Sequence, residues 1–206
     1  MYMVLDSYRS KADKILVPLS KKFLMLNPNT ISVSSLIFAA FAGIFYYLSF
    51  FSKYILFLSF IFLIFSALFD ALDGKIARLK NIASKKGDLI DHVFDRYSDI
   101  FIVLGMSFSI FGNIYLGLFA ILGILLTSYM GTQSQALGLK RDYSGIAGRA
   151  DRLVLMMIFT LIQIFVTGHF DVYNIKLYVT GILLIWFGIA GNINAITRFF
   201  DIYKNL

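Results

Sequence analysis

The sequence contains no cysteine and no glutamate, and only two of its residues are proline. Without cysteine, disulfide bonds and thiolate metal sites are excluded. Because glutamate is absent, all twelve acidic side chains are aspartates. There is also no internal repeat, low-complexity tract or spacer rich in proline, serine and glycine, so no linker divides the chain and we expect one main domain.

Charged residues are scarce as well. They make up 15% of the 206 residues, while 59% are hydrophobic and the mean hydropathy is +0.78. A soluble domain of this length usually has about a quarter of its residues charged. The excess of apolar side chains must therefore be covered by lipid, which predicts an integral membrane protein.

Six segments have the length of about 20 mostly apolar residues that a helix needs to cross a bilayer. They are residues 30–50, 54–79, 88–111, 114–137, 149–167 and 173–199. The predicted fold is therefore all-α: a polytopic membrane helix bundle with six transmembrane helices in residues 30–206.

The basic residues predict the orientation. They crowd the region before the first span, the junctions of spans two with three and four with five, and the end of the chain, whereas the opposite side offers only Lys53 and Lys176. By the positive-inside rule, both termini lie in the cytoplasm. This distribution explains the net charge of +7, so we expect no nucleic-acid partner.

Residues 1–29 precede the first span, and the first 24 of them have no continuous apolar core of the kind found in signal peptides. Apolar residues recur every three or four positions from Leu5 to Phe23, with basic residues elsewhere around the helix. This pattern predicts an amphipathic juxtamembrane helix at the cytoplasmic membrane surface.

Six of the twelve aspartates lie between residues 70 and 99, at the junction of spans two and three. Ionisable side chains in membrane helices are costly and mark functional sites by default. Asp70 and Asp73 share one helical face, and Asp91 and Asp95 share a face of the next helix. Two antiparallel helices can then direct four carboxylates at one volume. Such oxygen ligands favour Mg²⁺ or Mn²⁺, and four of them can bridge two ions.

The run Asp70-x-x-Asp73-Gly74-x-x-Ala77-Arg78, then eight residues, then Gly87-x-x-x-Asp91-x-x-x-Asp95 resembles the signature of the CDP-alcohol phosphotransferases at every fixed position. The resemblance implies a transferase that moves a phosphatidyl or archaetidyl phosphate from a CDP-linked lipid to a small polar alcohol and releases CMP. It also implies an active site at the cytoplasmic face of the cell membrane, and a homodimer.

Carried over residue by residue, the resemblance implies roles for the signature positions. The two divalent cations would be held by Asp70, Asp73, Asp91 and Asp95. Asp95 would be the general base that deprotonates the acceptor hydroxyl. The CDP site would be lined by Asp73, Gly74, Ala77, Arg78 and Gly87. Outside the signature, we expect Asp88 and Asp99 to be solvated or ion-paired, Arg96 to neutralise the cluster, and His92 and His169 to have no assigned role.

The acceptor is less well defined. Arg149, Arg152 and Arg198 lie on the same side as the aspartates, and three guanidinium groups suit a phosphate carried by the acceptor. The alternative is topological charge with Arg152–Asp151 or Arg198–Asp201 pairs.

The run from Asp95 to Asp99 and the run from Gly148 to Leu153 resemble phosphatidylinositol-phosphate and archaetidylinositol-phosphate synthases, which take inositol phosphate. Ser128-Tyr129, however, is followed by Met130 and Gly131 instead of the basic residues typical of those enzymes. Glycerol phosphate therefore stays open as the acceptor.

Two other classes compete with this interpretation. A divalent-cation transporter would distribute its acids through the depth of the membrane, whereas spans one and four contain none. An intramembrane prenyltransferase would separate its two aspartate-rich motifs much further in a longer chain. The sequence favours the phosphotransferase.

Overall fold

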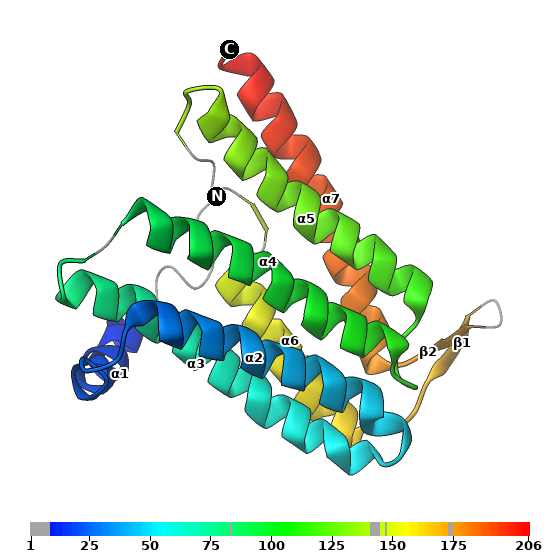
Figure 1. Cartoon of the computed structure of the whole chain (residues 1–206). Helices are drawn as coiled ribbons and strands as arrows, with labels where there is room; N and C mark the ends of the chain where they lie inside the picture. Colours follow the sequence, from blue (N-terminus) through cyan, green and yellow to red (C-terminus); the bar gives the residue numbers. More distant parts are fainter. Residues whose placement is uncertain (1–8, 83, 141–144, 147, 173–174) are drawn as a thin grey trace.

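The computed structural model describes residues 9–82, 84–140, 145–146, 148–172 and 175–206 (Figure 1). Most of these residues are in seven α-helices: α1 (Arg9–Lys22), α2 (Pro28–Tyr47), α3 (Leu56–Leu79), α4 (Lys85–Phe108), α5 (Ile114–Ala136), α6 (Arg149–Phe165) and α7 (Val179–Lys204). Two 3₁₀ turns, Leu48–Phe50 and Lys53–Ile55, join α2 to α3. A helix bundle is therefore confirmed as the main architecture.

A short hairpin departs from the all-α prediction. Strands β1 (Phe170–Val172) and β2 (Ile175–Leu177) pair antiparallel, with Phe170 opposite Leu177. The last helix was expected to begin at residue 173 but begins at Val179. Strands of three residues are too short for alternation to distinguish them from the start of an apolar helix, so this part of the prediction is wrong.

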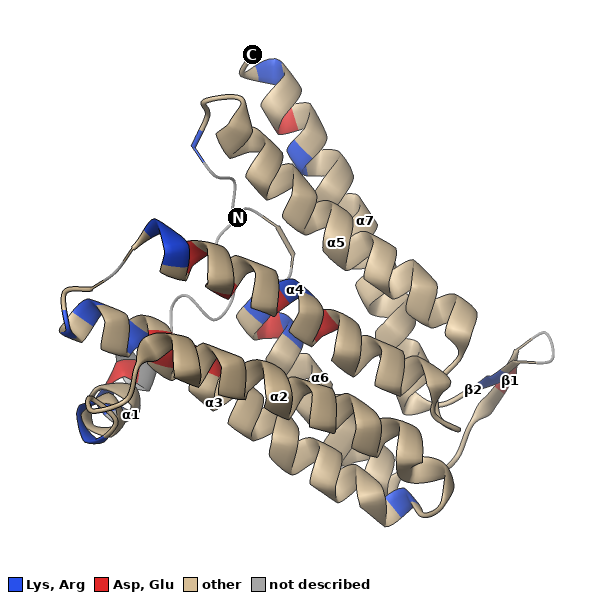
Figure 2. Cartoon of the chain, in the orientation of Figure 1, with Lys and Arg blue, Asp and Glu red and all other residues tan. Residues whose placement is uncertain are grey.

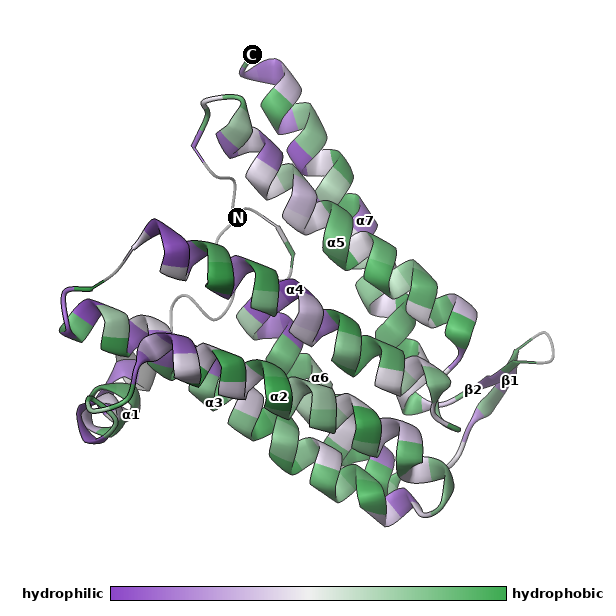
Figure 3. Ribbon diagram, viewed as in Figure 1, coloured by the Kyte–Doolittle hydropathy of each residue, from purple (hydrophilic) through white to green (hydrophobic). Residues whose placement is uncertain are grey.

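Four described helical segments are long and apolar enough to cross a membrane: Pro28–Phe50, Lys53–Leu79, Ile114–Ala136 and Val179–Lys204. Helix α4 carries charged residues through its first half, and α6 has only 17 residues. Figure 3 shows the same division, with polar residues gathered on α1 and at the junction of α3 and α4. An integral membrane protein is confirmed, while passage of α4 and α6 through the bilayer stays a prediction.

The N-terminal helix packs against the end of α3. Lys75 Nζ on α3 lies 2.5 Å from Asp13 Oδ1 on α1, and the side chains of Leu16 and Leu19 pack near the buried Ile76. The predicted helix includes residues 1–8, which lie outside the described residues, and its position at the membrane surface stays a prediction.

The helices form two groups (Figure 1). Helix α2 packs against both α3 and α4, and α5 packs along α7. The groups meet where α4 contacts α5 and where α6 contacts both α3 and α7. An added Cβ on Gly105 would collide with the backbone of Gly43, and one on Gly191 with the backbone of Gly123. Small residues thus let α4 approach α2 and α7 approach α5 closely, as is common between membrane helices.

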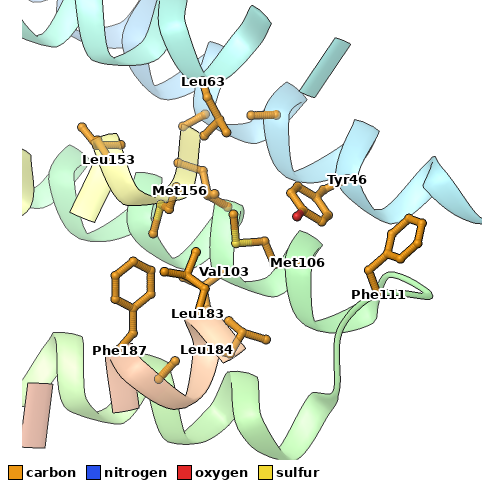
Figure 4. Close-up of a cluster of buried hydrophobic side chains, with 14 of the residues drawn as sticks. Tyr46, Leu63, Val103, Met106, Phe111, Leu153, Met156, Leu183, Leu184 and Phe187 are labelled. Carbon is orange, nitrogen blue, oxygen red and sulfur yellow. The ribbon is translucent and has the colours of Figure 1, made fainter. Parts of the chain in front are cut away.

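One apolar core joins these groups away from the aspartates (Figure 4). Met106 from α4, Met156 from α6, and Leu183 and Phe187 from α7 are almost completely buried in it. Because this core fixes α4 relative to α6, it also fixes the charged ends of these two helices relative to each other.

Candidate metal and substrate site

The aspartates of α3 and α4 converge as their spacing predicted. Carboxylate oxygens of Asp70, Asp73 and Asp91 lie within 4.8 Å of one another. A second group joins Asp91 and Asp95 with a ring nitrogen of His92 at the same limit. Asp91 belongs to both groups, so the four predicted ligands form one continuous cluster, which we call the aspartate cluster.

Local structure explains this convergence. Helix α3 ends at Leu79 and α4 begins at Lys85, so their charged ends face each other across a short connection. Asn81 supplies the turn with a positive φ of 56°, a conformation that asparagine tolerates better than most residues. Ser84 then caps α4, its side chain accepting a hydrogen bond of 3.2 Å from the Gly87 N–H.

The carboxylate of Asp73 accepts a hydrogen bond from a residue that is not part of the signature. Ser32 Oγ on α2 donates a hydrogen bond of 2.5 Å to Asp73 Oδ2, and both residues are buried. Second partners of this kind fix the orientation of a carboxylate that binds a metal. Ser32 was not among the predicted site residues, because a contact between residues 41 positions apart leaves no local pattern in the sequence.

Arg149, the first residue of α6, lies among the aspartates. Its Nη1 forms an ion pair with Asp70 and lies 2.8 Å from Asp95 Oδ1. The contact with Asp95 is a charge pairing only, because Asp95 Oδ1 is buried without a hydrogen-bond partner among the described residues. Arg96, expected to neutralise the cluster, donates a hydrogen bond from Nη1 to the His92 carbonyl.

Hydrogen bonds hold the backbone of the segment before α6 and so fix the position from which the Arg149 side chain extends. Asn194 on α7 accepts a hydrogen bond of 2.9 Å from the Ile146 N–H. Gly145 has a φ of 147°, and a Cβ there would meet the Asn194 side chain. Asp151 accepts a hydrogen bond of 2.9 Å from the Gly148 N–H and so caps the helix. Asn194 was not predicted to matter, because this role depends on a contact between distant segments.

The other two predicted acceptor residues are placed differently. Arg152 Nη2 pairs with Asp99 Oδ2 at 2.5 Å, with both side chains largely buried, so Arg152 pairs with Asp99 and not with Asp151. This confirms the ion pair expected for Asp99. Arg198 Nη1 donates a hydrogen bond of 2.8 Å to the Thr127 carbonyl on α5. Arg149 thus contacts the aspartate cluster, whereas Arg152 pairs with Asp99 outside it.

We expect Asp99→Asn to lower the free energy of unfolding by about 3–5 kcal/mol, the usual cost of leaving one partner of a buried ion pair unpaired. Asp88→Asn is the matched control, because its side chain is 72% exposed beside His92, and should change stability little. Denaturant unfolding in detergent measures both. The double variant Asp99→Asn/Arg152→Gln should recover much of the loss; equal stability of Asp99→Asn and the wild type would contradict the pairing.

A cavity of about 370 Å³ opens beside the cluster. Its lining includes all the residues predicted for CDP, namely Asp73, Gly74, Ala77, Arg78 and Gly87, together with Asp91. It also includes Asn27, Pro28, Asn29 and Ser32 at the start of α2, none of which was among the predicted site residues. Asn27 is the cap of α2, accepting a hydrogen bond of 3.1 Å from the Asn29 N–H.

The aspartate cluster fits a divalent cation by its chemistry. It offers several hard oxygen ligands, including Asp95 Oδ1, which is buried and accepts no hydrogen bond among the described residues. Hard oxygen donors are the ligands that Mg²⁺ and Mn²⁺ prefer. His92, which had no predicted role, adds a nitrogen donor to the second group and lies 3.4 Å from Asp88 through Nε2.

The fold and this site define a class: a helical membrane protein with acidic residues gathered on α3 and α4 (Figure 2) and a cavity beside them. Residues 25–192 match the family of CDP-alcohol phosphatidyltransferases. This match covers most of the chain, so the chain belongs to that family, and the predicted class of enzyme is confirmed at the level of the family.

Two relatives of known name are similar in sequence. The archaetidylinositol phosphate synthase of Methanothermobacter thermautotrophicus is 33% identical over 92 residues, which are 45% of this chain and 47% of that protein. The bifunctional IPC transferase and DIPP synthase of Archaeoglobus fulgidus is 31% identical over 145 residues, 67% of this chain and 28% of that protein. The matched segments thus span about half or less of these relatives.

A solved structure shares the fold. The Mycobacterium tuberculosis phosphatidylinositol phosphate synthase PgsA1, solved with CDP-DAG bound, has a TM-score of 0.75 at 19% identity, covering 92% of this chain and 94% of that one. The same protein has also been solved in complex with manganese and citrate. At this identity the likeness shows the fold alone.

Proposed function

We propose that this chain transfers a lipid phosphate from a CDP-linked lipid to the hydroxyl of a small polar alcohol and releases CMP. One observation carries the proposal: the family's eight signature residues come together in space, with the aspartates converging beside a cavity that the remaining signature residues line. Membership of the family supports the same reaction.

We assign the cavity to the CDP part of the donor. Arg78 lines the cavity and donates from Nε to the Gly74 carbonyl at 2.9 Å, which leaves its terminal nitrogens available for a diphosphate. The N-terminus of α2 opens on the same cavity, and the amide groups at a helix N-terminus favour an anion. Gly74 and Gly87 line the cavity without side chains, so the nucleotide could approach the backbone closely there.

The aspartate cluster would hold the divalent cations, two Mg²⁺ or Mn²⁺ ions held by Asp70, Asp73, Asp91 and Asp95. Bound there, the cations would supply positive charge against the diphosphate and the leaving CMP. Asp95 has a side chain that is only 16% exposed, and we assign it as the base. The acceptor oxygen forms a bond to the lipid-linked phosphorus, the bond from that phosphorus to CMP breaks, and the hydroxyl proton passes to Asp95.

We propose a phosphorylated polyol, such as inositol phosphate, as the acceptor. Arg149 Nε and Arg152 Nε are buried without hydrogen-bond partners among the described residues, so two guanidinium groups retain donors for a phosphate. The names of the archaeal and mycobacterial relatives also point to inositol phosphate. Glycerol phosphate would use the same donors and is the alternative.

The location of the site is part of the proposal. The end of α3 and the start of α4, which contain Lys75, Lys80, Lys85 and Lys86, are rich in basic residues close to the aspartates of the same helices (Figure 2). By the positive-inside rule this end faces the cytoplasm, as do both termini. We further propose a homodimer, as the family resemblance implies.

The test is CMP release by the purified protein in detergent with a CDP-linked lipid, Mg²⁺ or Mn²⁺, and separate acceptors. Inositol phosphate should give the fastest release, with glycerol phosphate, free inositol and free glycerol as comparisons. If none of these acceptors gives CMP, the phosphotransferase proposal fails. Metal flux into proteoliposomes would then support a divalent-cation transporter instead.

The acceptor proposal has its own control in the same assay. Arg152→Ala should raise the KM for a phosphorylated acceptor while leaving the KM for the CDP-linked lipid unchanged, because Arg152 does not line the donor cavity. The double variant Asp99→Asn/Arg152→Ala shows whether the effect survives when the buried charge of Asp99 is also removed. An unchanged KM in both variants would assign Arg152 to structure alone.

A further inference from the structure

Arg149 uses carboxylates that a divalent cation at this site would also need. Its Nη1 contacts both Asp70 and Asp95, one from each end of the aspartate cluster. We propose that Arg149 is an internal counterion that competes with the divalent cations for these two carboxylates and is released when the cations bind. The inference rests on the metal site of the proposed function.

The burial of these groups makes the competition strong. The side chains of Arg149, Asp70 and Asp95 are 17%, 24% and 16% exposed. Charges shielded from water interact more strongly than charges in bulk solvent. A doubly charged cation on the same oxygens would repel the guanidinium group directly. Cation binding and the Arg149 ion pairs should therefore exclude each other.

The position of Arg149 allows this release. It is the first residue of α6, so its side chain is attached where the helix begins and not within the packed core of Met156 and Phe187. The preceding backbone is held by the Ile146–Asn194 hydrogen bond and by the Gly148–Asp151 cap. The proposed release therefore requires rotation of the Arg149 side chain and no movement of α6.

The competition has a consequence for the acceptor. A guanidinium group paired with two carboxylates is a poor site for a phosphate, because the anion would meet those carboxylates. Once cations hold Asp70 and Asp95, Arg149 has its charge and its unpartnered Nε available for an anion. Linkage then requires that cations and a phosphorylated acceptor each strengthen the binding of the other.

The test is direct binding of Mn²⁺ to the purified full chain without donor or acceptor, followed by electron paramagnetic resonance of the free ion. Arg149→Gln should bind Mn²⁺ more tightly than the wild type, within the range of about 5–150-fold that is usual for coupling between sites. Arg149→Lys keeps the charge but has no planar fork to bridge two carboxylates. The Mn²⁺ affinity of Arg149→Lys should therefore lie between those of the wild type and Arg149→Gln.

Arg78→Gln is the matched control. It also removes one positive charge beside the aspartate cluster, but Arg78 lines the cavity and bonds the Gly74 carbonyl, whereas Arg149 pairs with Asp70 and Asp95. The Mn²⁺ affinity should therefore rise much less. One outcome would overturn the competition but leave the metal site confirmed: the wild type binds Mn²⁺, and both Arg149→Gln and Arg149→Lys bind it with equal or lower affinity. If Arg78→Gln matches Arg149→Gln, the effect is general electrostatics and the competition is also overturned.

Failure of the proposed function gives a different result. If the wild type binds no Mn²⁺ and releases no CMP, the metal site and the competition both fall. If Arg149→Gln does not fold, Arg149→Lys decides: an affinity above that of the wild type supports the competition, and an affinity equal to or below it overturns the competition.

Discussion

Asp95→Asn is expected to lower kcat by about 10²- to 10⁴-fold, the usual contribution of a positioned general base. Asparagine has nearly the same size and keeps one oxygen that can still face a cation, but its amide cannot accept the acceptor proton. Because Asp95 does not line the donor cavity, the affinity for the CDP-linked lipid should change little. Single-turnover CMP release and equilibrium binding of the labelled CDP-linked lipid measure the two quantities.

The control for this prediction is Asp88→Asn. Asp88 lies on the same helix and lines the donor cavity, but its carboxylate belongs to neither metal group. It should retain most of the wild-type kcat. Turnover by Asp95→Asn at the wild-type rate would remove Asp95 as the base, even if the metal site is confirmed.

The sequence specified the bundle well where hydropathy and length agree. Helices α2, α3, α5 and α7 follow from apolar runs of about 20 residues, and each observed start lies near the predicted one except that of α7. The hairpin of β1 and β2 was missed because its apolar residues continue into α7. Its two strands are stabilised by backbone pairing over only three residues each, which leaves almost no periodic signal.

The candidate site was predictable only within each helix. Spacings of three and four residues placed Asp70 with Asp73, and Asp91 with Asp95, because a helical turn converts spacing into a shared face. Contacts between distant segments were not predictable in the same way. Ser32 on α2 donates a hydrogen bond to Asp73 on the neighbouring α3, and Asn194 on α7 holds the segment before Arg149.

The pairing of the arginines with the aspartates was the part of the site that the sequence predicted least. Positive charge near a cluster of aspartates was expected, but composition cannot say which guanidinium group reaches which carboxylate. The structure pairs Arg152 with Asp99 and places Arg149 between Asp70 and Asp95. The packing of α6 between α3 and α7 decides this assignment, and that packing depends on core residues far from the charges.

Removal of divalent cations is expected to abolish CMP release completely, because the aspartate cluster, with Arg149 as a cationic partner in the described ion pairs, would then repel the diphosphate of the donor. Treatment with a chelator followed by gel filtration, and then addition of Mg²⁺ or Mn²⁺, measures the loss and its recovery. Activity that persists unchanged after chelation would contradict a metal-dependent reaction at this site.

The Mn²⁺ concentration needed for half-maximal CMP release should differ between variants of the aspartate cluster, and their order tests the arrangement of the ligands. Asp91 belongs to both groups of ligands, whereas Asp73 belongs to one, so Asp91→Asn should need the larger increase in Mn²⁺ for half-maximal CMP release. Ser32→Ala keeps every carboxylate but removes the hydrogen bond to Asp73 Oδ2. Loss of such a second partner usually weakens metal binding about 10–100-fold. If Ser32→Ala leaves the Mn²⁺ requirement unchanged, Asp73 does not depend on α2 for its orientation, and the link between the start of α2 and the metal site would be contradicted.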